Sequence, residues 1–156
     1  MKKFIVLLLS TFLIISACSN NKNEYTKEEI EYIDTINTAI DQTMKYYEKL
    51  NDSIRDTQNY NSDYSSNSAF SSMMGINLVN DTLKKEVTPP KRFKELHEDL
   101  LEGTELLSEV SVSLPVVINA NDTQGINENV EKFSKAIKII NDVYDELPHD
   151  EIKVKK

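Results

Sequence analysis

The sequence predicts an all-α protein, an antiparallel up-and-down four-helix bundle. Apolar residues recur every three or four positions through four separate stretches, which is the period of a helix with one buried face. Asn, Ser and Pro residues separate these stretches, and no segment of any length alternates as a strand would. Helices with short to medium connections favour a bundle. The alternative is a three-helix bundle in which residues 59–87 are largely irregular.

The first helix is expected over about residues 27–57. Thr26 and Glu29 form a capping box, in which each side chain accepts a hydrogen bond from the other residue's backbone N–H. Gly and Pro are absent from the stretch that follows. Its apolar positions are Ile30, Ile33, Ile36, Ile40, Met44, Tyr47, Leu50 and Ile54.

The second helix is the least regular of the four. Residues 59–72 contain nine Ser or Asn, which compete for backbone hydrogen bonds, so we expect a flexible loop there. The apolar stripe after it comprises Ala69, Met73, Ile76, Leu83 and Val87. Pro89 disfavours helical backbone at Thr88 and should end the helix.

The third helix can begin at Pro90, where a missing N–H costs nothing. Gly103 lies on its apolar face, and Pro115 should end or kink it. Residues 116–118 are then either a last turn or a buried extended piece. The apolar stripe comprises Phe93, Leu96, Leu100, Leu107, Val110 and Leu114.

The fourth helix should begin near Asp122 or Thr123, after a turn at residues 119–122, and end before Pro148. Its apolar spacing is the most regular of the four. The stripe comprises Ile126, Val130, Phe133, Ile137, Ile140, Tyr144 and Leu147.

The N-terminus has the features of a secretory signal. Lys2 and Lys3 precede an apolar run over residues 4–17, which is shorter than the ~20 residues of a membrane-spanning helix. The run ends in Ile15-Ser16-Ala17-Cys18, which resembles the lipobox of bacterial lipoproteins. This resemblance implies cleavage before Cys18, a diacylglyceryl group on its sulfur, palmitate labelling, and attachment to the extracytoplasmic face of the cell membrane. An uncleaved anchor and an ordinary secretory signal are the alternatives.

The expected organisation is therefore a signal peptide (1–17), a lipidated tether (18–25), a helical bundle (26–148) and a basic tail (149–156). The net charge is −8, and loss of Lys2 and Lys3 with the signal makes it −10. A chain this acidic repels phosphates, so we expect no nucleic-acid partner. The basic tail is expected to be a frayed, solvated end, with contact to anionic lipid as the alternative.

The residue types give little support to catalysis. Cys18 is the only cysteine, and the histidines are His97 and His149. His97 lacks a second His four residues later and a Glu three residues earlier, so the spacings of two helical metal motifs fail. We expect His97 on a helix surface, His149 exposed in the tail, no metal, no cofactor and no enzymatic activity.

Two surface features remain. Five carboxylates share one face of the third helix, at Glu95, Glu98, Glu102, Glu105 and Glu109. We expect a solvated helix face, and the alternative, suggested by the mutual repulsion of these carboxylates, is a partner-binding site for a basic protein surface or Ca²⁺. Five tyrosines crowd the first helix and the segment after it, as boundary packing or as a binding patch: Tyr32, Tyr46, Tyr47, Tyr60 and Tyr64.

The expected function follows from the anchor and the bundle. We expect a non-catalytic binding or accessory lipoprotein that acts on an envelope protein partner, as a secretion or assembly accessory, an immunity factor or an exclusion factor. The alternative is a solute- or cation-binding lipoprotein, which would need a pocket. No small-molecule pocket is evident from the sequence.

Overall fold

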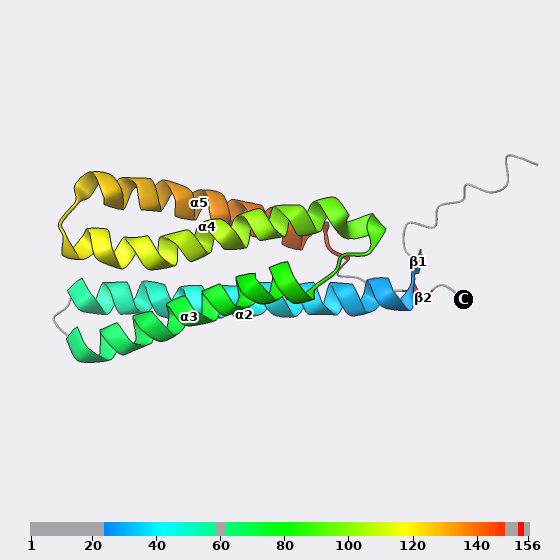
Figure 1. The fold of residues 1–156 in the computed structure, drawn as a ribbon, viewed down its shortest axis with the longest axis horizontal. Helices are drawn as coiled ribbons and strands as arrows, with labels where there is room; N and C mark the ends of the chain where they lie inside the picture. The colour runs from blue at the N-terminus through cyan, green and yellow to red at the C-terminus, as the bar shows by residue number, and fades with distance from the viewer. Residues whose placement is uncertain (1–23, 59–61, 149–152, 155–156) are drawn as a thin grey trace, which may run out of the picture.

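The computed structural model describes residues 24–58, 62–148 and 153–154, with side chains described over 24–52 and 70–148. It is an all-α four-helix bundle (Figure 1), as predicted. The elements are β1 (Glu24–Tyr25), α2 (Lys27–Gln58), α3 (Ser62–Glu86), the 3₁₀ turn η1 (Lys91–Phe93), α4 (Lys94–Asn119), α5 (Thr123–Glu146) and β2 (Lys153–Val154). Because residues 62–86 are helical, the three-helix alternative is wrong.

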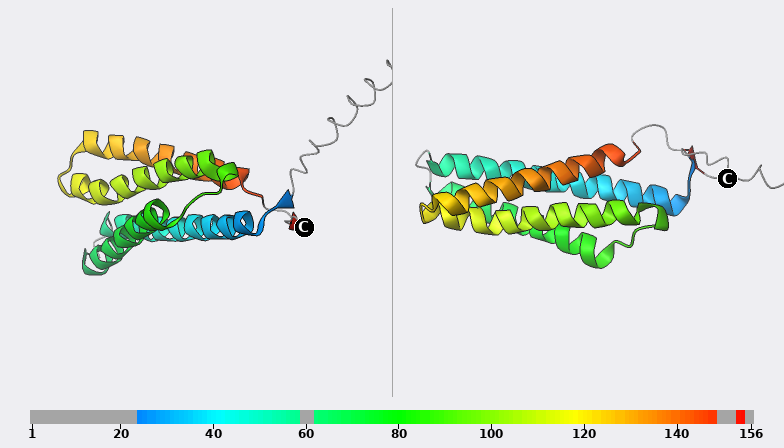
Figure 2. Two further views of the ribbon diagram at one scale, coloured as in Figure 1. Left: turned by 45° about the vertical axis from the view of Figure 1, so that its right-hand side comes forward. Right: turned by 90° about the horizontal axis from the view of Figure 1, so that it is seen from above.

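The bundle consists of two antiparallel hairpins. Helix α2 pairs with α3 and α4 pairs with α5, while α3 packs on α4 and joins the two pairs (Figure 2). Helices α2 and α5 make few contacts, although Tyr47 and Phe133 stack with ring centres 4.4 Å apart. The core is contributed by all four helices. Its most deeply buried members are Ile33, Ile36, Ile76, Leu83, Leu100, Leu107, Val110 and Ile140.

Helix α2 follows the prediction closely. Thr26 Oγ1 accepts from the Glu29 N–H at 3.2 Å, and Glu29 Oε2 accepts from the Thr26 N–H at 2.8 Å, so the capping box is present. The predicted stripe faces the core from Ile33 to Leu50. The Ile54 side chain lies outside the described residues.

Helix α3 begins inside the segment that was predicted as a loop, ten residues before that segment ends. Ser62 is already helical, so the loop expected over residues 59–72 is wrong from there on, and residues 59–61 lie outside the described ranges. Tertiary contact overrides the weak propensity of the Ser- and Asn-rich segment. Ser72 is 1 % exposed and Gly75 is buried against α2, so these small residues let the two helices approach.

Pro115 lies within α4 and does not end it, so the first of the two outcomes predicted for Pro115, the end of the helix, is wrong. The residues after it form the last helical turn, one of the two outcomes expected for 116–118. Backbone bonds hold this turn: the Asp122 N–H donates to the Val117 carbonyl at 3.0 Å, and the Ala120 N–H to the Val116 carbonyl at 3.0 Å. Asn121 adopts the left-handed conformation, with φ of 54°, that often closes a helix.

Helix α5 begins where predicted, with Asp122 as its cap accepting from the Gly125 N–H at 3.0 Å. Its buried face is offset from the predicted stripe. Val130 and Tyr144 are 52 % and 43 % exposed, whereas Asn129 and Ala136 are 6 % and 0 % exposed. Small and hydrogen-bonded residues face α4 because the two backbones run close together: a Cβ atom on Gly103 would lie 3.4 Å from the Ala136 carbonyl oxygen. Asn129 Oδ1 is hydrogen-bonded to Ser113 Oγ of α4, and Asn129 Nδ2 donates to the Gly125 carbonyl at 2.8 Å.

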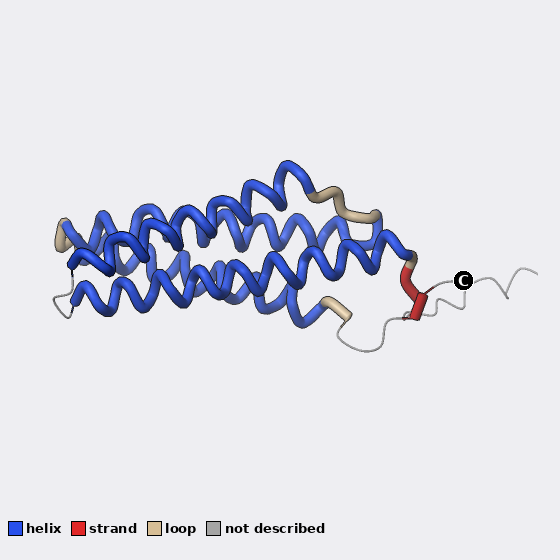
Figure 3. Tube along the Cα trace, turned by 90° about the horizontal axis from the view of Figure 1, so that it is seen from below, coloured by secondary structure: helices blue, strands red, loops and turns tan. Residues whose placement is uncertain are grey.

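Strands β1 and β2 pair in parallel at one end of the bundle (Figure 3), with Glu24 opposite Lys153 and Tyr25 opposite Val154. The expectation of a frayed tail is therefore wrong for Lys153–Val154, because the backbone ladder fixes them. The rest of the tail, including His149, lies outside the described residues. Tyr25 is 8 % exposed, stacks on Phe93 and lies 4.3 Å from the Arg92 guanidinium.

A groove between the first two helices

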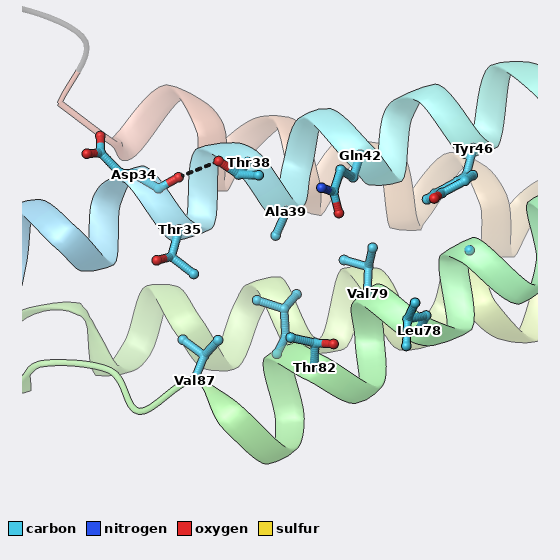
Figure 4. Close-up of a pocket in the computed structure, with 12 residues that line it drawn as sticks. Asp34, Thr35, Thr38, Ala39, Gln42, Tyr46, Leu78, Val79, Thr82 and Val87 are labelled. Carbon is cyan, nitrogen blue, oxygen red and sulfur yellow. Dashed lines mark hydrogen bonds between the residues drawn. The ribbon is translucent and has the colours of Figure 1, made fainter.

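A groove runs between α2 and α3 and is lined by residues of these two helices and by Val87, which follows α3 (Figure 4). Its volume is about 420 Å³, within the range of ~300–1,000 Å³ typical of ligand pockets. Nothing in the sequence indicated this groove. The groove arises where α2 and α3 pair without a third helix covering that side.

The α2 wall of the groove is polar. The Thr35 hydroxyl donates to the Glu31 carbonyl at 2.8 Å, and the Thr38 hydroxyl donates to the Asp34 carbonyl at 2.8 Å. Since both hydroxyl protons are used within the helix, the hydroxyl oxygens present acceptor lone pairs outward. Asp34 also lines the groove, and in the described part of the chain its carboxylate has no ion-pair partner.

The α3 wall is apolar. Val79 and Leu83 are buried and form the floor, while Leu78 is 66 % exposed at the edge. Tyr46 and Gly75 also line the groove, where the helices approach most closely. A Cβ atom on Gly75 would lie 2.5 Å from Tyr46 Cε1, so the missing side chain makes room for the ring.

The apolar edge continues along the outer surface of α3. Phe70, Met74 and Leu78 are 61 %, 59 % and 66 % exposed, and their spacing of four residues places them on one helix face. We call these three residues the α3 apolar stripe. Large side chains exposed in a row mark interaction surfaces more often than isolated ones do.

The acidic stripe on α4 is exposed at all five positions, Glu95, Glu98, Glu102, Glu105 and Glu109. Lysines neutralise four of these carboxylates. The ion pairs are Glu102–Lys135 at 2.7 Å, Glu109–Lys132 at 2.8 Å, Glu105–Lys84 at 3.4 Å and Glu98–Lys94 at 3.7 Å. The hydrogen bond to Glu109 and its charge raise the pKa of Lys132. The geometry favours the solvated-face interpretation, because the stripe already has cationic partners within the fold.

His97 is buried, 5 % exposed, and not on the helix surface as expected. The cause is its position on α4 opposite α2 and the end of α3: its Nδ1 lies 3.1 Å from the Tyr32 hydroxyl. Burial lowers the pKa of His97, although a hydrogen bond with the Leu83 backbone and the charge of Glu98 oppose that fall. The His97 ring therefore connects three helices by hydrogen bonds.

The described tyrosines of α2 pack at boundaries, as the first of the two interpretations predicted. Tyr32 is buried, and Tyr46 and Tyr47 are half-buried. Burial raises the pKa of Tyr47, with a further contribution from the charge of Glu48. Side chains 60 and 64 lie outside the described residues.

Cys18 also lies outside the described ranges, so the lipidation site has no structural test here. Over residues 24–58, 62–148 and 153–154, no three His, Cys, Asp or Glu side chains gather as a metal site would require. Among the helices described, none is both long and apolar enough to cross a bilayer.

The fold and the groove define the chain as a small four-helix-bundle protein with one uncovered, partly apolar side. Comparisons of the chain with known protein families, with curated proteins and with solved structures find no match. The α3 apolar stripe was missed in the sequence because Phe70 fell within the segment predicted as a loop. The spacing of Phe70, Met74 and Leu78 is the signal that reveals it, since it adds a second apolar face to α3.

Proposed function

We propose that the protein is a lipid-anchored bacterial surface lipoprotein that binds an envelope protein and performs no catalysis itself. The lipobox at Cys18 supports the anchor, and the uncovered groove with the α3 apolar stripe supports binding. The single observation that carries the binding role is this exposed apolar stripe, because a monomer without a partner gains nothing from three large exposed side chains in a row.

The anchor is tested by palmitate labelling of the producing cells. Substitution of Cys18→Ala should abolish labelling and release the protein from the membrane, because two acyl chains hold a protein far better than one or none. A matched Ser16→Ala variant, which keeps a small residue at its place in the lipobox, should be labelled normally. Labelling that persists in Cys18→Ala would overturn the anchor.

The binding role is tested by chemical crosslinking on intact cells. A specific crosslinked envelope protein is expected with the wild-type chain and is expected to be lost when Cys18→Ala releases the chain from the membrane. Identical crosslinking patterns for the anchored and released proteins would contradict a function that depends on the membrane surface.

A solute-binding lipoprotein is the second candidate, favoured by the volume of the groove. Thermal unfolding of the purified protein with candidate solutes distinguishes the two. A solute that raises the unfolding temperature in the absence of any protein, through RT ln(1 + [L]/Kd), favours this second function.

A further inference from the structure

We infer that the groove between α2 and α3 receives an amphipathic helix of another protein, apolar along one face and carrying Lys or Arg at the end that lies against Asp34. This inference deepens the proposed function and rests on it. It identifies the binding surface as the uncovered side of the first hairpin and not the acidic stripe of α4.

The shape of the surface favours a helix. The α3 apolar stripe continues directly into the groove at Leu78, and the groove extends along α3 to Val87. From Phe70 to Val87 the rise of an α-helix gives a length of roughly 25 Å, which matches about 17 helical residues of a partner. An apolar helix face laid into such a groove is a common mode of peptide recognition. A small solute would fill the groove but leave Phe70 and Met74 uncovered.

The polar wall favours a cation at one end. Asp34 is the only charged residue among those described in the lining. It is exposed at the rim of the groove, and Figure 4 shows its carboxylate directed away from α3, so a long Lys or Arg side chain of the partner meets it across the rim and not inside the groove. The Thr35 and Thr38 hydroxyl oxygens on the same wall present further acceptors. A guanidinium or ammonium group supplies the donors that this set of acceptors lacks. Toward the other end, Lys49 Nζ lies 5.9 Å from the Tyr46 ring centre, which disfavours a second cation there.

The overall charge of the protein favours a helix with a cationic end over two other possible occupants of the groove. A second copy of the mature chain would bring a further net charge of −10 to the surface, and an anionic bilayer would also repel it. A helix with a cationic end is attracted instead, both by Asp34 and by the field of the whole protein.

The test uses the full mature chain, residues 18–156 with Cys18→Ser, and synthetic 18-residue helical peptides. Each peptide has leucines along one face and two arginines at one end, made in both end orientations. The matched peptides carry two glutamates at the same places. In binding titrations at low ionic strength, one arginine peptide should bind at least tenfold more tightly than its glutamate counterpart.

Substitutions test whether the arginine peptide binds at the groove. Leu78→Lys should weaken binding of the arginine peptide at least tenfold, whereas Val116→Lys should leave it unchanged. Val116 is a matched control because it is 65 % exposed, on α4, against 66 % for Leu78. Asp34→Lys should reverse the preference toward the glutamate peptide, and circular dichroism checks that every variant keeps its helix content.

Several results would overturn the inference. The first is that neither arginine peptide binds when it is present at 100-fold the protein concentration. The second is that arginine and glutamate peptides bind equally well. The third is that Leu78→Lys and Val116→Lys change the binding to the same extent. A dimer in sedimentation that Leu78→Lys dissociates would assign the surface to a second copy. Binding to phosphatidylcholine–phosphatidylglycerol vesicles that Leu78→Lys abolishes would assign it to lipid. Palmitate labelling does not involve the groove, and crosslinking on cells captures a partner bound at any surface, so both can succeed where this inference fails.

Discussion

The two hairpins of the bundle each have a glycine at their closest approach, but the glycines have different neighbours. In the α4–α5 hairpin, a Cβ atom on Gly103 would lie 2.9 Å from Ile140 Cγ1 and 3.4 Å from the Ala136 carbonyl oxygen. In the α2–α3 hairpin, the neighbour of Gly75 is the Tyr46 ring. In the α4–α5 hairpin the glycine therefore packs against buried side chains and backbone. In the α2–α3 hairpin it packs against a half-buried side chain that lies beside a groove. Both hairpins contribute to the core, but only the α2–α3 hairpin also has an open groove beside its glycine.

The largest expected effect comes from truncating one large aliphatic side chain in each hairpin. Ile140→Ala should lower the free energy of unfolding by about 2–5 kcal/mol, because Ile140 is fully buried and its loss leaves a cavity. Leu78→Ala should change it by less than about 0.5 kcal/mol, because the side chain is mostly in water. Urea denaturation measures both. Losses of equal size would contradict the exposure of Leu78 at the edge of the groove.

A smaller effect is expected from adding one methyl group at each glycine. Gly103→Ala should lower the free energy of unfolding by about 1 kcal/mol, since overpacking of about 1–3 kcal/mol exceeds the ~1 kcal/mol gain in helix propensity. Gly75→Ala should leave stability nearly unchanged, because the Tyr46 ring can turn into the groove and the propensity gain offsets the movement.

Thermal unfolding together with NMR of the Tyr46 ring protons tests this pair. The ring signals should shift in Gly75→Ala and stay in place in Gly103→Ala. A greater loss of stability in Gly75→Ala than in Gly103→Ala would reverse the comparison.

The smallest effect concerns pH and the contact between the hairpins. The pKa of His97 is lowered in the folded state by burial, while the unfolded side chain has its ordinary value of about 6.5. The unfolded state therefore binds more protons as pH falls, so the contribution of His97 to stability is complete above about pH 6.5 and is lost as pH falls through 6.5 toward the folded pKa.

Urea denaturation between pH 5.5 and 7.5 measures this dependence, in a range where most carboxylates stay ionised. His97→Gln should flatten the profile relative to the wild type. His149→Gln is the control with the other histidine and should leave the slope as it is. A wild-type slope retained in His97→Gln would show that another group is responsible.

The sequence predicted the parts of the fold that depend on large apolar residues in regular order. Thr26 with Glu29 and the isoleucines of α2 determine that helix because local hydrogen bonds and one apolar face agree. The offset of α5 was not predictable from apolar spacing, because its buried face uses Asn129 and Ala136, which rank low on hydrophobicity. Ala136 lies opposite Gly103 of α4, and Asn129 is hydrogen-bonded to Ser113 of the same helix, so both are buried by the pairing of α5 with α4.

The same reasoning explains which parts of the site were predictable. The acidic stripe was visible in the sequence, but three of its four lysine partners come from α3 and α5 and depend on the tertiary arrangement. The groove was not visible, because it depends on how α2 and α3 pair and on the absence of a helix over that side. Lipidation of Cys18 stays a prediction from the sequence.

The pairing of β1 with β2 has a mechanical consequence. With Cys18 lipidated as proposed, six peptide steps, at most about 20 Å, separate the acyl chains from Glu24. Helix α2 is 32 residues long, so the tip of the bundle stands roughly 48 Å beyond that point. Tension on the anchor enters the bundle at Tyr25, where Val154 shares it, so both ends of the chain resist the pull together.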